Sequence, residues 1–272
     1  MTGEAAPSRE VEGGTGWYVY GVVPAEEASV DAFSGVRGVN PDLPITLVRD
    51  GNIAAVASRV PLAEFGEDSI DEHLGRPEWL GEKVREHELV LEAALAQMPV
   101  VPFRFGTIYR GEEQVRQMLR EHGSLAATLE RVRGTVELGV KGFVNADRFD
   151  ASVGGEPDED VSGGRAYMLR KQLDRRRAEA RAAFAASCSK ESFERLAAAA
   201  RESRPLSVQR PEVSGHSGEM FLNSAHLVEI SHEGAFRQTV AELESTYGRE
   251  GAEYHVTGPW PPYNFVGVGE GA

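Results

Sequence analysis

The stretch Trp17-Tyr18-Val19-Tyr20-Gly21-Val22-Val23 decides how the first part of the chain folds. It joins aromatic and β-branched side chains without a charge, which is typical of a buried strand. Pro24 ends this strand because it has no N–H to donate. Two more strands are predicted over residues 43–48 and 53–60. The residues between them, Asp50-Gly51-Asn52, favour the left-handed backbone of a tight hairpin.

Helices follow these strands. Pro77 begins a long helix, where its missing N–H falls in the first turn, and Pro99 ends it. Residues at spacings of three and four form one face of this helix: Leu80, Val84, His87, Leu91 and Leu95. Residues 100–109 are apolar and interrupted by proline, which predicts an edge strand. Two short helices are expected over residues 112–122 and 124–132.

The second half of the chain predicts six elements in the order β-α-β-β-α-β. They are expected at residues 136–144, 165–201, 206–213, 220–230, 231–247 and 252–256. The first helix is either continuous or broken near residues 187–190. Ser231 is expected to cap the second helix, and Gly248 to end it in the left-handed conformation. This succession is the ferredoxin-like order.

A chain of 272 residues favours two domains over one. We therefore expect an α+β protein with a disordered tail at residues 1–15, a mixed α+β domain at 16–134 and a ferredoxin-like domain at 135–272. The second domain includes an acidic, glycine-rich loop at residues 152–164, whose composition cannot build a core. It ends in a tail rich in proline and aromatic residues.

The composition limits the partners and the compartment. The net charge is −14, and residues 1–163 carry 15 Lys/Arg against 29 Asp/Glu. An acidic chain repels nucleic acid and anionic membranes, so neither is an expected partner. No apolar run approaches the roughly 20 residues that span a bilayer, and no signal peptide is expected. The single cysteine fits a reducing cytoplasm, where we expect the protein to act.

No catalytic, cofactor or metal motif is found. Seven histidines are present, but none is paired as His-x3-His or stands at ligand spacing from Cys or Asp. Cys188 has no base near it in the sequence, so we expect a small buried side chain. No Gly-x-Gly-x-x-Gly or Gly-Lys-Ser/Thr loop occurs. The sequence therefore predicts a protein that is not an enzyme and carries no cofactor.

Two arginine-bearing segments are candidate binding surfaces. Residues 165–181 hold seven Lys/Arg and two Asp/Glu, and include Arg170, Arg175 and Arg177. This basic stretch is either a solvated face that pairs with the acidic N-terminal half or a docking surface for an acidic partner segment. Arg104 and Phe105 form the second segment. We expect the Arg104 guanidinium to stack on a ring or pair with a carboxylate.

The closing stretch Gly258-Pro259-Trp260-Pro261-Pro262-Tyr263-Asn264-Phe265-Val266 is the third candidate. Its three prolines exclude a continuing helix or a central strand. In one interpretation Trp260, Tyr263 and Phe265 cover the open edge of the second sheet. In the other they contact a partner, as Trp and Tyr often do at hot spots. The second interpretation predicts that Trp260→Ala and Tyr263→Ala weaken binding at nearly unchanged stability.

Four segments resemble the gas vesicle GvpF/GvpL family. They are residues 17–23, Val101-Pro102-Phe103-Arg104-Phe105-Gly106-Thr107, Gly164-Arg165-Ala166-Tyr167-Met168-Leu169, and 222–243 running on to 258–266. Asn264 departs from the pattern, because many members have Ser there. The resemblance implies a two-domain α+β accessory protein whose second domain is a modified ferredoxin-like fold.

The resemblance also implies partners and a role. Such a protein binds the hydrophobic shell subunit of the gas vesicle and other accessory proteins, limits aggregation and assists shell nucleation. We expect it in the cytoplasm and at the gas vesicle, and one sequence does not separate GvpF from GvpL. Two alternatives stay open: a minor component incorporated in the shell, or a small-ligand-binding or enzymatic ferredoxin-like protein.

Overall fold

The computed structural model describes residues 14–153, 164–210 and 215–267, and the chain forms two compact units. One unit holds the residues up to Gly134 together with those from Pro261 onward. The other runs from Thr135 to Trp260, so it is inserted into the first along the chain. The expected second domain extended to residue 272, whereas the second unit ends at Trp260 and the closing residues belong to the first.

The first unit is built on an antiparallel sheet. Its strands are β1 (Thr15–Pro24), β2 (Ile45–Asp50), β3 (Ile53–Pro61), β4 (Val101–Pro102) and β5 (Ile108–Tyr109). They lie in the order β2-β3-β1-β4, and β5 also pairs with β1. The predicted strands at 43–48 and 53–60 are confirmed with small shifts of their ends. Gly51 has a φ of 58° in the turn between β2 and β3, as the hairpin signal predicted.

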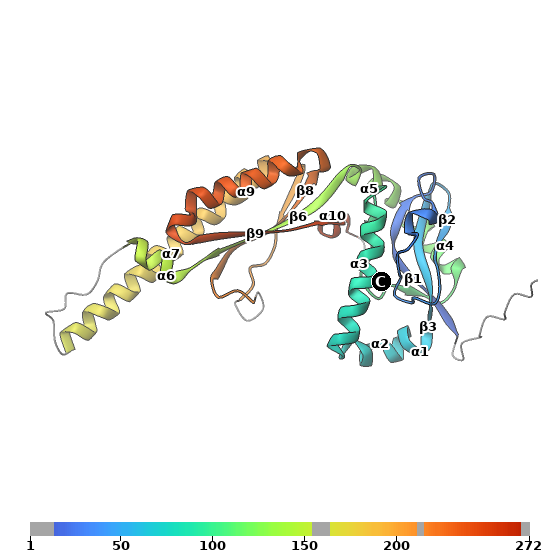
Figure 1. The fold of residues 1–272 in the computed structure, drawn as a ribbon, viewed down its shortest axis with the longest axis horizontal. Coiled ribbons are helices and arrows are strands. Elements are labelled where there is room, and N and C mark those ends of the chain that lie inside the picture. The colour runs from blue at the N-terminus through green and yellow to red at the C-terminus, as the bar shows by residue number, and fades with distance from the viewer. Residues whose placement is uncertain (1–13, 154–163, 211–214, 268–272) are drawn as a thin grey trace, which may run out of the picture. The chain divides into compact units, whose positions relative to one another are not determined.

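Helices cover this sheet. They are α1 (Leu62–Phe65), α2 (Glu67–Leu74), α3 (Pro77–Leu95), α4 (Glu112–Glu121), α5 (Leu125–Val132) and α10 (Tyr263–Val266), with a 3-10 turn η1 (Val30–Phe33). β1 and β3 are buried almost throughout, and successive side chains of a strand point to opposite faces, so both faces of the sheet are covered. His87 and Leu91 of α3 pack against Tyr18 and Tyr20 of β1, while α4 and α5 also contact the strands (Figure 1).

The second unit holds a four-stranded sheet. Its elements are β6 (Thr135–Val144), α6 (Ala146–Val153), α7 (Gly164–Ala198), β7 (Glu202–Pro205), β8 (Glu219–Glu229), η2 (Ile230–His232), α9 (Glu233–Tyr247), η3 (Gly248–Glu250) and β9 (Ala252–Trp260). The strands are antiparallel in the order β7-β8-β6-β9. The Tyr254 hydroxyl lies 2.7 Å from Ser192 Oγ on α7, which shows that Ala252 and Tyr254 face the helices.

Some expectations about the second unit were wrong. The strand expected at 206–213 is found at Glu202–Pro205 instead, and of the expected span residues 211–213 lie outside the described part of the chain. Helix α6 was not predicted, and its last two residues, Ser152 and Val153, belong to the expected loop at 152–164. Residues 154–163 of that loop lie outside the described part. Helix α7 is continuous from Gly164 to Ala198, without the break considered near 187–190.

The expected helix ends at α9 were also wrong. Ser231 lies in the 3-10 turn η2, and α9 begins after His232, which makes no side-chain capping bond. Gly248 has a right-handed φ of −64° and continues into η3. The left-handed residue is Gly251, with a φ of 91°, because the extra 3-10 turn delays the reversal by three residues. Phe236, Val240 and Leu243 form the buried face of α9, as their spacing predicted.

Candidate partner-binding surfaces

The residues of the closing stretch are divided between the two units. Gly258, Pro259 and Trp260 end strand β9 of the second unit, and the residues from Pro261 onward belong to the first unit. Trp260 keeps 38% of its surface exposed, whereas Phe265 is 1% exposed. Among the three aromatic side chains predicted to contact a partner, Trp260 is therefore the one that presents a large ring surface to solvent.

Tyr263 ties the end of the chain to helix α3. Its hydroxyl lies 2.8 Å from Glu88 Oε1 and 3.3 Å from His87 Nε2, while His87 Nδ1 lies 2.9 Å from the Tyr18 hydroxyl. The Gly106 N–H donates to the Tyr18 oxygen at 3.1 Å. These distances fit one direction of donation: Tyr18 O–H to His87 Nδ1, His87 Nε2–H to Tyr263, and Tyr263 O–H to the Glu88 carboxylate.

Burial sets the charges in this hydrogen-bond chain. It lowers the pKa of His87 to about 4, so the imidazole is neutral and has one donor and one acceptor nitrogen. Burial also raises the pKa of Glu88, an effect that the Tyr263 hydrogen bond opposes and that nearby Glu92 reinforces. Among the described residues buried Glu88 Oε2 has no hydrogen-bond partner, so the Tyr263 hydroxyl is the donor there on which the carboxylate depends.

The rest of the tail is anchored in the first unit. Pro261, Pro262, Phe265 and Val266 are buried, and the Arg131 guanidinium donates to the carbonyl oxygen of Phe265. Tyr263 and Phe265 thus pack in the first unit, and Trp260 is the one ring of the three that belongs to the unit of the second sheet. Since the pattern of rings and prolines carries no signal of the long-range contact, the sequence could not show to which unit each ring belongs.

Arg104 and Phe105 have separate environments. Arg104 is exposed, and its carbonyl oxygen accepts from Thr107 Oγ1 at 2.8 Å. Among the described residues its guanidinium has neither the carboxylate partner nor the stacked ring that the sequence suggested. Phe105 is half-buried against Tyr18 and His87, with ring centroids 6.1 and 6.0 Å away. Its contacts are those of a core-edge residue.

The first half of α7 is the most exposed part of the second unit. In Figure 1 it extends beyond the sheet, beside α6. Three successive large apolar side chains lie there in solvent: Tyr167, Met168 and Leu169 are 66%, 57% and 45% exposed. The next turns bring six cations, Arg170, Lys171, Arg175, Arg176, Arg177 and Arg181, against Asp174 and Glu179. We call residues 167–181 the α7 arm.

Local partners satisfy part of the charge on the α7 arm. Arg175 Nε lies 2.8 Å from Glu179 Oε1, and Arg181 Nη1 lies 3.2 Å from Asp150 Oδ1 of α6. Arg170 and Arg175 are exposed, whereas Arg177 is half-buried. The predicted basic stretch is thus a surface in which three exposed apolar side chains precede the cations, and the exposure of these apolar side chains was not predicted from the sequence.

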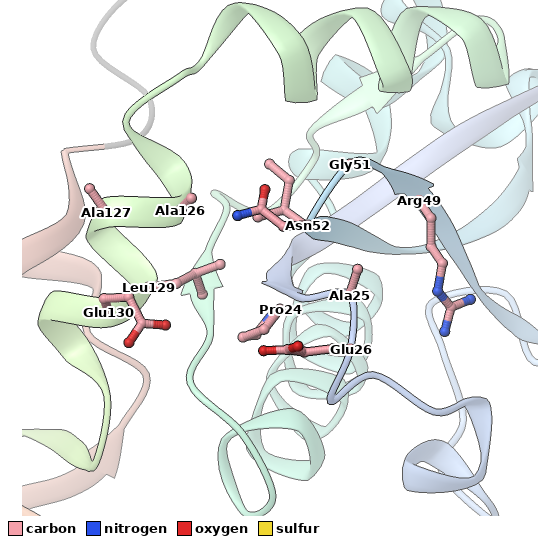
Figure 2. A pocket seen from close by; sticks show the side chains of 11 residues that line it. Pro24, Ala25, Glu26, Arg49, Gly51, Asn52, Ala126, Ala127, Leu129 and Glu130 are labelled. Atoms are coloured by element: carbon pink, nitrogen blue, oxygen red, sulfur yellow. The ribbon is translucent and has the colours of Figure 1, made fainter.

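The structure also contains depressions and buried titratable groups. A depression of about 600 Å³ is lined mainly by small apolar side chains of the β1 end, the β2–β3 turn and α5, with Glu26, Arg49 and Glu130 among the lining residues (Figure 2). Burial raises the pKa of Cys188 to about 12 and lowers that of His226 to about 4. Neither residue lines this depression or the second one, which adjoins Met220. Cys188 and His226 are therefore buried side chains that lie apart from both depressions.

One group of side chains in the described residues could hold a metal ion. It consists of His216, Glu253 and His255, whose ligand atoms all lie within 4.8 Å of one another. The spacing of the histidines did not predict this group, because His216 is far from Glu253 and His255 along the chain. Of the residues described, no helix is both long and apolar enough to cross a membrane.

These features define a mixed α+β protein with two sheets and exposed apolar and cationic groups on one long helix. The family model for "Gas vesicle synthesis protein GvpL/GvpF" matches residues 16–267, and the chain belongs to this family of gas vesicle proteins. Gas vesicle protein L of Streptomyces sp. (strain CB03234) is 30% identical over 258 residues, which are 93% of each chain. Gas vesicle protein F1 of Halobacterium salinarum is 27% identical over 94% of each.

Solved structures have the same fold. The crystal structure of GvpF from Anabaena sp. PCC7120 superposes with a TM-score of 0.67 at 18% identity, over 93% of this chain and 97% of that one. GvpF from Microcystis aeruginosa gives a TM-score of 0.63 at 17% identity, over 92% and 98%. The family model and the relatives confirm the family resemblance predicted from the sequence, and the protein belongs to a family involved in gas vesicle formation.

Proposed function

We propose that this protein is an accessory factor for gas vesicle assembly, which binds the hydrophobic shell subunit and limits its aggregation before the shell forms. A subunit that builds a gas-tight wall exposes a large apolar surface beforehand, and such a surface aggregates. A strongly acidic chain with a local apolar contact surface suits transient binding. Its action is by protein contact in the cytoplasm and at the growing vesicle, and it transforms no substrate.

The observation that carries this proposal is the exposure of Tyr167, Met168 and Leu169 at the start of the α7 arm. Three neighbouring large apolar side chains in water cost free energy, which a partner's apolar surface recovers on contact. The arginines that follow have aliphatic stems and charged heads. They extend the apolar contact while choosing acidic partner segments.

The test is retention of the untagged chain on an immobilised shell subunit. We expect the combined variant Tyr167→Ser, Met168→Ser and Leu169→Ser to reduce retention by about tenfold or more, since truncation of hot-spot side chains costs at least 1–2 kcal/mol. Arg170→Glu with Arg175→Glu is expected to weaken retention most at low salt. Retention equal to that of the wild-type chain in both variants would refute the α7 arm as the contact.

A matched control uses apolar residues of the same unit outside the arm. Val208 and Ile230 are 59% and 54% exposed, so Val208→Ser with Ile230→Ser removes two exposed apolar side chains that lie outside the arm. We expect this control to bind as the wild-type chain does. If neither the wild-type chain nor any variant is retained, and the wild-type chain does not reduce light scattering by the shell subunit, the proposed function itself is wrong.

We further propose that the second unit is a modified ferredoxin-like domain. Its element order, β6-α7-β7-β8-α9-β9, and its antiparallel strand order support this assignment. The modification is the added helix α6 and the length of α7. A domain of this kind hosts many functions, so the assignment says nothing by itself about the partner.

A further inference from the structure

Strand β9 presents two metal-ligating side chains on one face of the second sheet. Glu253 and His255 are two residues apart, so both point away from the face on which Tyr254 meets α7. Phe143 of β6 is directly opposite Glu253 in the ladder and shares its face. This face therefore carries a carboxylate and an imidazole beside a buried ring.

His216 reaches the same place from the segment that precedes β8. Its ring stacks on Phe143 with centroids 4.0 Å apart and planes 23° apart, and it lies 5.2 Å from the His255 ring. Its Nε2 atom is 3.3 Å from Glu253 Oε2. Phe143 is thus a platform that holds His216 toward the two side chains of β9.

The distances suit a small cation. The three ligand atoms lie within 4.8 Å of one another, and ligands of a tetrahedral zinc ion are about 3.3 Å apart, given bonds of about 2.0–2.1 Å. All three side chains are partly or largely exposed. Small rotations of these side chains can therefore shorten the distances between their ligand atoms to those of a zinc site. An ion pair between His216 and Glu253 would leave the approach of His255 without a role, whereas a shared cation uses all three.

We propose that His216, Glu253 and His255 form a site for a first-row divalent cation, with Zn²⁺ as the preferred ion and water in the fourth position. Two imidazoles and one carboxylate are a donor set that zinc accepts. Arg148 Nη1 lies 3.1 Å from Glu253 Oε1, which orients the carboxylate and leaves Oε2 for the ion.

Ion binding has one local structural cost. The Gly218 N–H donates to His216 Nδ1 at 2.9 Å, so Nε2 carries the proton of the neutral ring. A ring that binds the cation through Nε2 must move this proton to Nδ1, and the bond from Gly218 then opens. The turn between residues 215 and 218 is therefore the part of the backbone that responds to the ion.

The test uses the full chain without a polyhistidine tag, treated with EDTA and dialysed. Calorimetric titration with Zn²⁺ is expected to show one ion per chain, and Co²⁺ to give the visible absorption of a tetrahedral site. His255→Ala and Glu253→Gln are each expected to weaken Zn²⁺ binding by about tenfold or more. Both side chains lie at the surface, so far-UV circular dichroism is expected to stay unchanged.

His232→Ala is the matched control. His232 is also an exposed histidine near a carboxylate, with Nδ1 3.6 Å from Glu229 Oε2, but it belongs to no three-residue cluster of ligands within the described part of the chain. We expect it to bind Zn²⁺ as the wild-type chain does. No binding by the wild-type chain, or equal affinities for the wild type and His255→Ala, would overturn the site. An equal loss in His232→Ala would also overturn it, because binding would then be a general property of surface histidines.

Discussion

The hydroxyl group of Tyr263 donates a 2.8 Å hydrogen bond to Oε1 of Glu88, a residue 175 positions earlier in the chain. The bond joins the last described helix, α10, to α3, and both belong to the first unit. The second unit is inserted between them in the sequence. Tyr263 therefore closes the first unit after the chain has returned from the inserted one.

Tyr263→Phe is expected to destabilise the first unit by about 1–3 kcal/mol, because the variant keeps the ring and removes the donor on which the half-buried Glu88 carboxylate depends. Urea unfolding at pH 7 measures the change. Tyr167→Phe is the matched control, since Tyr167 is 66% exposed. Equal stability of the two variants would contradict a role of the Tyr263 hydroxyl.

Glu88→Gln is expected to gain stability relative to the wild type as the pH rises. The folded protein raises the pKa of Glu88, so near its titration the folded state binds more protons than the unfolded state does. The ionised side chain therefore costs stability as pH rises through that range, and glutamine avoids this cost. The stability of Glu88→Gln relative to the wild type should rise from pH 4 to pH 7. A relative stability that is flat or falls would show that burial does not dominate at Glu88.

Short-range sequence patterns were sufficient to predict several elements. The apolar strand β1, the hairpin at Gly51, the proline at the start of α3 and the buried face of α9 all follow from short-range patterns. The order of elements in the second unit followed from the same patterns. The family followed from four segments read together.

Long-range contacts account for what the sequence did not predict. Nothing near Tyr263 indicates that its partner is Glu88, and nothing near His216 indicates that β9 brings Glu253 and His255 beside it. Strand β7 is polar and includes Pro205, so its place at the edge of the sheet depends on pairing with β8. Sequence reasoning likewise identified the charges of the α7 arm but could not assign exposure to Met168 or Leu169.

Phe265→Ala is expected to destabilise the protein more than Trp260→Ala does, because Phe265 is buried and Trp260 is partly exposed. Phe265 is 1% exposed, so Phe265→Ala should cost about 3–5 kcal/mol of unfolding free energy. Trp260 is 38% exposed, and Trp260→Ala should cost about 1 kcal/mol. Thermal or urea unfolding of the two variants measures the difference. Similar losses would mean that the closing stretch acts as one structural piece.

Two buried histidines predict sensitivity to acid. Burial lowers the pKa of His87 and of His226 to about 4, below the ordinary value of 6.5. Between pH 6.5 and 4 the unfolded state therefore binds more protons, and the free energy of unfolding falls as pH falls. Each histidine contributes a slope of up to about 1.4 kcal/mol per pH unit.

His226→Gln tests the contribution of one of these histidines. The variant should lose part of the slope between pH 6.5 and 4 in urea unfolding, whatever its stability at pH 7. In the wild-type chain the His226 ring lies between Ser203 Oγ and Ser224 Oγ, each 2.8 Å from a ring nitrogen. A glutamine at this position therefore keeps polar partners. His232→Gln at the surface should keep the full slope. An unchanged slope in His226→Gln would mean that His226 titrates alike in both states.

Cys188 is expected to report unfolding of the second unit. It is the single cysteine of the chain, it is 1% exposed, and burial raises its pKa to about 12. Because the thiolate is the reactive form, alkylation of the native protein at pH 8 should be slower than that of the urea-unfolded chain by roughly three orders of magnitude. Combining Cys188→Ser with Ser187→Cys moves the thiol to an exposed position of α7, where native and unfolded rates should be similar. Native labelling of Cys188 within about tenfold of the unfolded rate would mean that α7 detaches from the sheet at equilibrium, because the thiol is otherwise screened from the reagent.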